Sequence, residues 1–317
     1  MNATVKLTAF ALVLGLVFGG AVLAGATFDP TDPEETEMSS HGENGGDHGQ
    51  SDNGAAPAES AGPVVGGLAV SQDGYTLETQ QNLFESGTPA RFSFVITDDR
   101  GQTVREEFEP EHERELHLIV VRRDTAIYQH LHPRKDDDGT WSVQLTLPEP
   151  GVYRAYADFS IDGTGRTLAT DLFVPGDFRP EPLPEAASSD FDGGYDVELR
   201  AVGAKAGADS ELSFAVTRAG QPVEDLEDYL GVKGHLVALR EGDLAYLHVH
   251  PIADKRDAQA EDEDHVHGKD SGGDTRTHAN EISFAATFPS AGRFRLFLQF
   301  KTEGEIRTVA YTTEVSR

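Results

Sequence analysis

The chain has 317 residues, enough for two ordinary domains and a tail. It contains no cysteine, which excludes disulfides, cysteine-ligated zinc, iron–sulfur clusters and blue copper, because each of these needs a thiolate. The 55 acidic and 26 basic residues give a formal charge of −29, which repels nucleic acid and anionic membranes and favours cations. The acids are spread along the chain, so we expect a surface suited to high salt and a halophilic source; the alternative is a specific cationic partner.

The N-terminus is typical of a targeting segment. Lys6 precedes a run from Leu7 to Ala26 without a charge, and Ala24-Gly25-Ala26 fits a small-residue cleavage site. The run of about 20 residues is also long enough to span a bilayer. Residues 1–26 are therefore predicted to be a signal peptide or a membrane anchor. Either one places the remainder outside the cytoplasm, secreted or tethered to the outer face of the membrane.

Residues 27–62 consist mostly of Asp, Glu, Gly, Ser, Asn and Pro. Almost none of these side chains can form a hydrophobic core, so the segment is predicted to be a disordered acidic tether.

The remaining sequence predicts an all-β fold. Short runs rich in Val, Leu, Phe, Tyr and Thr recur about every ten residues between Gly, Pro and Asp, a spacing typical of sandwiches. The runs are near 67–72, 90–97, 115–122, 126–132, 140–147, 151–160 and 166–174, then 195–202, 210–217, 233–240, 244–250, 281–288, 292–300 and 305–315. We expect two tandem immunoglobulin-like β-sandwiches.

The two halves are copies of one unit. "HLIVVRRDTAIYQHLHP" (117–133) matches "HLVALREGDLAYLHVHP" (235–251), and "WSVQLTLPEPGVYRAYADF" (141–159) matches "ISFAATFPSAGRFRLFLQF" (282–300). We assign residues 63–176 to repeat 1 and 191–317 to repeat 2. The segment 177–190 is a Pro-rich, semi-rigid linker.

One turn supports the sandwich assignment. The chain turns through 148–151 (Pro-Glu-Pro-Gly) and Tyr153 begins the next strand, like the tyrosine corner of immunoglobulin-type domains. Repeat 2 has Phe294 at the same place and lacks the hydroxyl.

Repeat 2 also carries an insertion. Pro251 and Ile282 are thirty-one residues apart, whereas Pro133 and Trp141 are eight apart. The extra segment, 252–280, is acidic and holds three more histidines, and we expect a disordered loop. It is either a solvated loop without a role or a weak cation trap.

The best functional clue is the pattern H-x12-H-x-H-P, which occurs in both repeats. Histidine is the commonest metal ligand among side chains. The two copies give six candidate metal ligands: His117, His130 and His132, then His235, His248 and His250.

A hairpin would bring each triplet together. A two-residue turn at Arg123-Asp124 pairs His117 with His130, and His132 follows two residues later on the same face. The equivalent turn at Glu241-Gly242 pairs His235 with His248. We therefore expect one three-histidine site per repeat, unless a bulge shifts the register by one residue.

Other residues fall on the same face as the histidines. Tyr128 and Tyr246 would lie opposite Ile119 and Val237 and form an apolar floor. Asp158, which matches Gln299 in repeat 2, is a candidate fourth ligand, a residue that fixes a histidine tautomer, or only a structural carboxylate.

The strings "HLIVVRRD…YQHLHP" and "GHLVALREGDLAYLHVHP" resemble a family of secreted or membrane-tethered bacterial and archaeal proteins described as heavy-metal-binding, or YtkA-like. The resemblance covers about residues 65–315. It implies an extracytoplasmic location, β-sandwich repeats and an association with copper.

The sequence thus predicts a non-enzymatic extracytoplasmic protein that binds Cu(II) or Zn for buffering or delivery. The chain has no cysteine and only two methionines, and this shortage of sulfur ligands favours these ions over Cu(I). One alternative is a surface interaction or adhesion module with structural histidines. A metal hydrolase is a weaker alternative, since Asp158 is the only candidate general base.

Overall fold

The computed structural model describes residues 65–201, 203–252 and 280–317. All the regular secondary structure in these residues is β-strand, which confirms the all-β prediction. Our predictions for 1–26, for 27–62 and for most of the insertion lie outside the described residues. No helix of the described part is long and apolar enough to cross a membrane. Both sandwiches belong to one compact unit of the chain, Ser60–Arg317.

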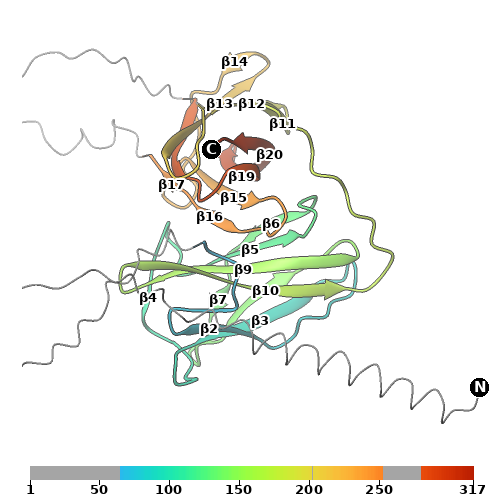
Figure 1. Ribbon diagram of the computed structural model, residues 1–317, viewed down its shortest axis with the longest axis vertical. Coiled ribbons are helices and arrows are strands. Elements are labelled where there is room, and N and C mark those ends of the chain that lie inside the picture. Colours follow the sequence, from blue (N-terminus) through green and yellow to red (C-terminus); the bar gives the residue numbers. More distant parts are fainter. Residues whose placement is uncertain (1–64, 202, 253–279) are drawn as a thin grey trace, which may run out of the picture. The chain divides into compact units, whose positions relative to one another are not determined.

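Repeat 1 is a sandwich of two antiparallel sheets (Figure 1). The first sheet contains, in spatial order, β1 (Ser71–Gln72), β2 (Tyr75–Thr79), β3 (Ala90–Thr97), β8 (Trp141–Leu145) and β7 (Arg134–Lys135). The second contains β10 (Thr164–Val174), β9 (Gly151–Ile161), β5 (His117–Arg122) and β6 (Tyr128–Leu131), with β4 (Phe108–Glu109) also paired to β9.

Repeat 2 has the same arrangement. Its first sheet contains β11 (Ser189–Asp192), β12 (Tyr195–Ala201), β13 (Asp209–Arg218), β18 (Glu281–Thr287) and β17 (His250–Pro251), with β14 (Gln221–Pro222) beside β13. Its second sheet contains β16 (Tyr246–His248), β15 (Gly234–Arg240), β19 (Gly292–Thr302) and β20 (Glu305–Val315).

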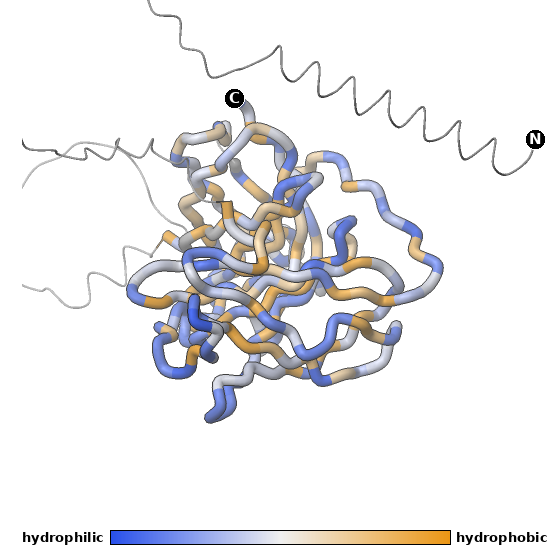
Figure 2. The backbone as a smooth tube through the Cα atoms, turned by 60° about the horizontal axis from the view of Figure 1, so that its bottom comes forward, coloured by the Kyte–Doolittle hydropathy of each residue, from blue (hydrophilic) through white to orange (hydrophobic). Residues whose placement is uncertain are grey.

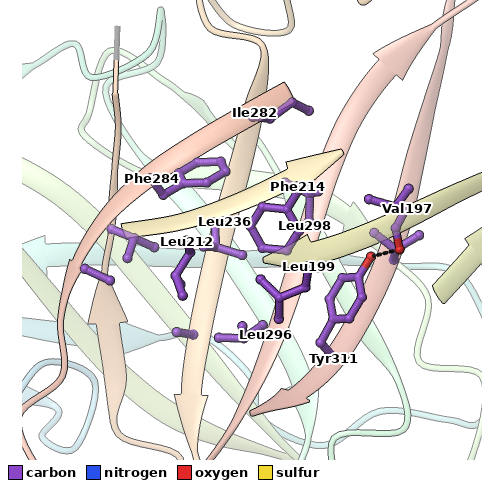
Figure 3. Packing of buried hydrophobic residues seen from close by; sticks show 14 of the residues in the cluster. Val197, Leu199, Leu212, Phe214, Leu236, Ile282, Phe284, Leu296, Leu298 and Tyr311 are labelled. Atoms are coloured by element: carbon purple, nitrogen blue, oxygen red, sulfur yellow. Dashed lines mark hydrogen bonds between the residues drawn. The ribbon is translucent and has the colours of Figure 1, made fainter. Parts of the chain in front are cut away.

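Each sandwich has its own hydrophobic core between its sheets. The core of repeat 1 includes Phe92, Trp141 and Tyr153, and that of repeat 2 includes Phe214, Phe284 and Tyr311, several of them drawn in Figure 3. Hydrophobic stretches run through the strands, whereas several of the outermost loops are hydrophilic (Figure 2).

The tyrosine corner of repeat 1 forms as the sequence predicts. The Tyr153 hydroxyl donates to the carbonyl of Glu149 at 2.8 Å. Phe294, at the same place in repeat 2, has no hydroxyl to make this bond and is buried in the core. The corner supports the immunoglobulin-like assignment.

A third hydrophobic cluster joins the two repeats. Strand β5 is buried along its whole length, because Leu118 and Val120 belong to the core of repeat 1 while Ile119 and Val121 belong to this third cluster. Residues of β15, β16 and β19 complete the cluster from the side of repeat 2. The second sheets of the two sandwiches therefore pack against each other.

The contact between the repeats is reciprocal. Tyr128 of repeat 1 stacks on Phe297 of repeat 2, with ring centroids 4.2 Å apart. Tyr246 is the equivalent of Tyr128, and it packs against Tyr156, the equivalent of Phe297, at 5.4 Å. Such matched pairs are typical of a two-fold interface between like subunits. Here the two subunits are repeats of one chain.

The Pro-rich linker is held by both repeats. The backbone N–H of Glu181 donates to Asp124 at 2.9 Å, and Phe178 lies under the Arg122 guanidinium. On the side of repeat 2, Arg293 donates to the carbonyl of Pro184 at 2.8 Å. These contacts at both ends support the docked arrangement of the sandwiches.

The start of repeat 1 also lies at this interface. Of the first strand expected near 67–72, only the last two residues form a strand, β1. The carbonyl of Gly66, just before the expected strand, accepts the N–H of Tyr246 at 3.0 Å. The carbonyl of Gly67 accepts two bonds from Arg154, at 3.0 and 2.8 Å. A Cβ on Gly67 would lie 2.5 Å from the Tyr156 ring, so the two tyrosine rings leave room for glycine alone.

We expect Gly67→Ala to lower the free energy of unfolding by about 2–5 kcal/mol. A positive φ costs about 1–2 kcal/mol for alanine and overpacking costs about 1–3 kcal/mol more. Gly163→Ala is the matched control, because Gly163 also has a positive φ (65° against 72°) but nothing lies within 4 Å of its Cβ position. Denaturant titration at constant high salt measures both. Equal losses would show that the interface does not restrict residue 67.

Candidate metal centre

The histidine hairpins form, but in a different register from the predicted one. In repeat 1, Ile119 pairs with His130, and in repeat 2, Val237 pairs with His248. The predicted pairs, His117 with His130 and His235 with His248, are therefore wrong by two residues. The cause is the turn, which has four residues in both repeats. The N–H of Arg122 donates to the carbonyl of Ile127, and the N–H of Arg240 donates to the carbonyl of Ala245.

The correction preserves the face on which the histidines lie. Side chains alternate along a strand, so a shift of two residues keeps them on the same side of the sheet. Continued by one step, the ladder of repeat 1 places His132 opposite His117. The chain then leaves this sheet, since Arg134 already pairs with Ser142 of the other sheet. The same shift places Tyr128 opposite Val121, not opposite Ile119.

Three histidines of repeat 1 meet at the end of the β5–β6 hairpin. One ligand atom from each of His117, His130 and His132 lies within 4.8 Å of the other two. The ring centroids are 4.7 to 5.2 Å apart. Nδ1 of His117 and Nε2 of His130 are 2.9 Å apart. The convergence predicted for this triplet is therefore present.

The outer nitrogens of two rings are already engaged. Nε2 of His117 is 3.0 Å from the carbonyl oxygen of Glu111, and a carbonyl can only accept, so this nitrogen carries the proton. Nδ1 of His130 is 2.9 Å from Oε1 of Gln299, where it donates in the same way. When both rings are neutral, Nδ1 of His117 and Nε2 of His130 each carry a lone pair, and the two lone pairs face each other.

The ring of His132 has a buried nitrogen, Nε2, without a hydrogen-bond partner. Buried polar atoms are nearly always satisfied, and an exception calls for an explanation such as an ion. A cation bound by the facing nitrogens of His117 and His130 and by this buried nitrogen of His132 would satisfy all three atoms.

Burial lowers the pKa of three of these imidazoles, those of His130, His132 and His235. Desolvation, followed by the nearby His117 and other imidazoles, lowers the pKa of His130 well below its ordinary 6.5. Desolvation and His117 lower the pKa of His132 to about 4. Desolvation also lowers the pKa of His235 to about 3, against a raising effect from its bond to Tyr229. Only unprotonated imidazole binds metal, so the site is ready for an ion at neutral pH.

The three histidines predicted as ligands in repeat 2 do not form a second described site. His235 adjoins the triplet of repeat 1, with ring centroids 5.9 Å from His117 and 5.7 Å from His130. The side chains of His248 and His250 are outside the described residues, so a separate site in repeat 2 stays a prediction.

Asp158 lies directly opposite His117 on β9 and is buried. Its carboxylate accepts the hydroxyls of Thr167, at 2.8 Å, and of Tyr246, at 3.1 Å. It is not a member of the three-residue group. Its partner in the other repeat, Gln299, lies opposite His235 in the same way, which confirms that the two positions match.

Sequence analysis missed the contribution of Gln299 to His130, because the two residues are 169 positions apart and belong to different repeats. One signal was present. The run "HLIVVR" is continuously apolar after its histidine, unlike a strand with one solvated face, and indicates burial on both sides. A small cavity of about 30 Å³, lined by His117, His130 and His235 among others, lies at this contact.

We predict that the metal-free protein loses stability as the pH falls below 6.5. The folded-state pKa values of His132 and His235, about 4 and about 3, lie below the ordinary value, so unfolding takes up protons. The contribution of these neutral histidines to the free energy of unfolding is fully present above pH 6.5, and it declines as the pH falls toward these two pKa values.

Urea unfolding with a chelator, between pH 7 and 5 at constant high salt, measures this slope. His132→Gln removes one titrating ring and should flatten the slope, whereas His265→Gln, in the insertion, should not. A wild-type slope that persists in His132→Gln would contradict the assignment.

Solved structures similar to this chain have low similarity scores. A DUF4426 family protein from Pseudomonas aeruginosa is 10% identical (TM-score 0.26) and covers 41% of this chain and 97% of its own. The Escherichia coli adhesin FdeC is 13% identical (0.24; 78% and 66%). The Yersinia pseudotuberculosis adhesin InvE is 12% identical (0.22; 77% and 60%), so this chain spans less than two thirds of either adhesin chain.

Similarities of this size carry no conclusion about function. No curated protein is similar enough in sequence to count as a relative. A family match, in contrast, covers both repeats, at residues 69–176 and 188–317. The chain therefore belongs to the DUF8832 family, a domain of unknown function.

Proposed function

We propose that the protein binds a Zn or Cu(II) ion through His117, His130 and His132, outside the cytoplasm, for buffering or delivery of the metal. One observation carries this proposal. The outer N–H groups of two rings are fixed by acceptors, so that the inner lone pairs of His117 and His130 point at each other beside the orphaned Nε2 of His132. A cation satisfies all three nitrogens at once.

A purely structural role accounts less well for the same contacts. Two facing lone pairs 2.9 Å apart repel unless one ring gains a proton, and burial opposes a proton on His130. Histidines that ligate metal, by comparison, almost always donate their other N–H to a carbonyl, amide or carboxylate. Glu111 and Gln299 supply such acceptors here.

The spacing of the ligand atoms suits a small ion after a modest closure. In a tetrahedral zinc site with bonds of about 2.0–2.1 Å, two imidazole nitrogens are roughly 3.3 Å apart. The ligand atoms of the triplet lie within 4.8 Å of one another, so closure needs a movement of up to about 1.5 Å in the widest pair. Imidazole-only ligands suit zinc and copper(II), whereas copper(I) selects sulfur, which this chain almost lacks.

The proposed location rests on the sequence. The uncharged run before Ala26 is typical of export or anchoring, and the net charge of −29 attracts cations to the surface. A protein exposed to the cell exterior meets metal ions directly, which fits a role in capture or transfer.

We expect isothermal titration of the full-length chain in high salt to show one zinc or copper(II) ion that is lost in His132→Ala. Loss of a hydrogen bond to a metal-ligating histidine lowers metal affinity roughly 10–100-fold, and removal of a ligand itself should lower it further. The triple variant His265→Ala/His267→Ala/His278→Ala is the control, because it removes three imidazoles of the insertion. Unchanged binding in His132→Ala would refute the site.

The role of Gln299 gives a second test. Gln299→Leu removes the acceptor for His130 and should weaken metal affinity roughly 10–100-fold. Gln299→Glu keeps an acceptor oxygen but raises the pKa of His130, so it should bind with nearly wild-type affinity at alkaline pH and lose affinity sooner than the wild type as the pH falls. If both variants bind like the wild type, then the amide does not orient His130.

A further inference from the structure

We propose that His235 of repeat 2 is the fourth ligand of this ion, so that one metal is shared by both repeats and holds them together. This inference rests on the proposed function, because it concerns the same ion. It replaces the expectation of two separate three-histidine sites with one site between the repeats.

His235 is prepared for metal in the same way as its equivalent, His117. Nε2 of His235 is 2.9 Å from the carbonyl oxygen of Tyr229, and Nε2 of His117 is 3.0 Å from that of Glu111. Both carbonyls precede their histidine by six residues. Nδ1 of His235 is therefore the nitrogen with the lone pair.

The ring positions approach those of a four-imidazole site. With zinc–nitrogen bonds of about 2.0–2.1 Å, ring centroids lie roughly 3.2 Å from the ion and roughly 5.2 Å from one another in a tetrahedron. The three rings of repeat 1 are 4.7 to 5.2 Å apart, and His235 is 5.9 and 5.7 Å from His117 and His130. His235 lies outside the group that gathers within 4.8 Å, so binding includes a small movement of its side chain.

A cavity adjoins three of the four proposed ligands. Its volume is about 30 Å³, and His117, His130 and His235 line it, whereas His132 is not among its lining residues. About 10–15 Å³ already holds a water molecule, so an ion fits. Tyr246 and Asp158 also line it, which places the cavity against the reciprocal contact of the two sheets.

Repeat 2 then contributes twice to the same ion. Gln299 on β19 holds the outer nitrogen of His130, and His235 on the adjacent strand β15 faces the cavity. Both contributions exist only while the sandwiches are docked. An ion that binds the docked state better must stabilise that state in proportion to its differential affinity.

The test uses zinc and the full-length chain, with His235→Gln as the variant. Glutamine can still donate to the carbonyl of Tyr229, so the local fold is kept while the ring nitrogen is lost. Calorimetry should still give one zinc per chain, with an affinity lower by more than the roughly 10–100-fold that the loss of an outer contact costs. Hydrogen exchange should show zinc slowing β5–β6 and β15 in the wild type, but only β5–β6 in His235→Gln.

Two outcomes separate this inference from the proposed function. If the wild type binds no zinc, or keeps it in His132→Ala, the metal site itself is refuted. If zinc is lost in His132→Ala but binds His235→Gln with wild-type affinity and equal slowing of β15, then only the shared ion is refuted. The triple variant His265→Ala/His267→Ala/His278→Ala is the control for binding outside the site.

Cobalt(II) gives an independent reading of the coordination number. A four-coordinate cobalt ion absorbs visible light strongly, whereas a six-coordinate ion completed by water absorbs weakly. We expect strong absorption in the wild type and a marked decrease in His235→Gln. Identical spectra would overturn the proposal.

Discussion

The docking of two like sheets against each other is the constraint on which the site depends. The stacked pair of Tyr128 and Phe297, with its counterpart Tyr156 and Tyr246, fixes the relative position of the repeats. Aromatic pairs of this kind add about 0.5–1.5 kcal/mol each beyond the area that they bury. The same docking buries His130 and His235, which lowers the pKa of both imidazoles. Without it, His130 would lose both its burial and its acceptor.

Local pattern in the sequence predicts the parts of the site that belong to one hairpin. The register was wrong by two residues because the turns have four residues, as shown by Thr125 and Leu244, which adopt positive φ. The convergence of His117, His130 and His132 was right nevertheless. Side-chain direction in a strand depends on whether a shift is odd or even, and this shift is even. A prediction of which residues share one face of a sheet tolerates an even shift in register, whereas a prediction of exact cross-strand pairs does not.

Contacts between the repeats could not be predicted in the same way. Nothing near His130 in the sequence points to Gln299, and nothing near His117 points to His235, because sheet-to-sheet packing follows from complementary surfaces and not from spacing. The duplicated sequence does show which strands are equivalent. The apolar runs of β5 and β15 indicate that both strands are buried on two sides. Together these signals imply an interface, but not which histidines meet across it.

The difference between Asp158 and Gln299 explains how two copies of one unit can serve different ends. A carboxylate beside His130 would favour the imidazolium and raise its pKa, whereas the neutral amide of Gln299 accepts the N–H without adding charge. The equivalent carboxylate, Asp158, instead accepts the hydroxyls of Thr167 and Tyr246. One copy of the position therefore holds the interface together and the other keeps a ligand neutral. Divergence at this single pair of residues makes the two sides of a nearly symmetrical contact chemically distinct.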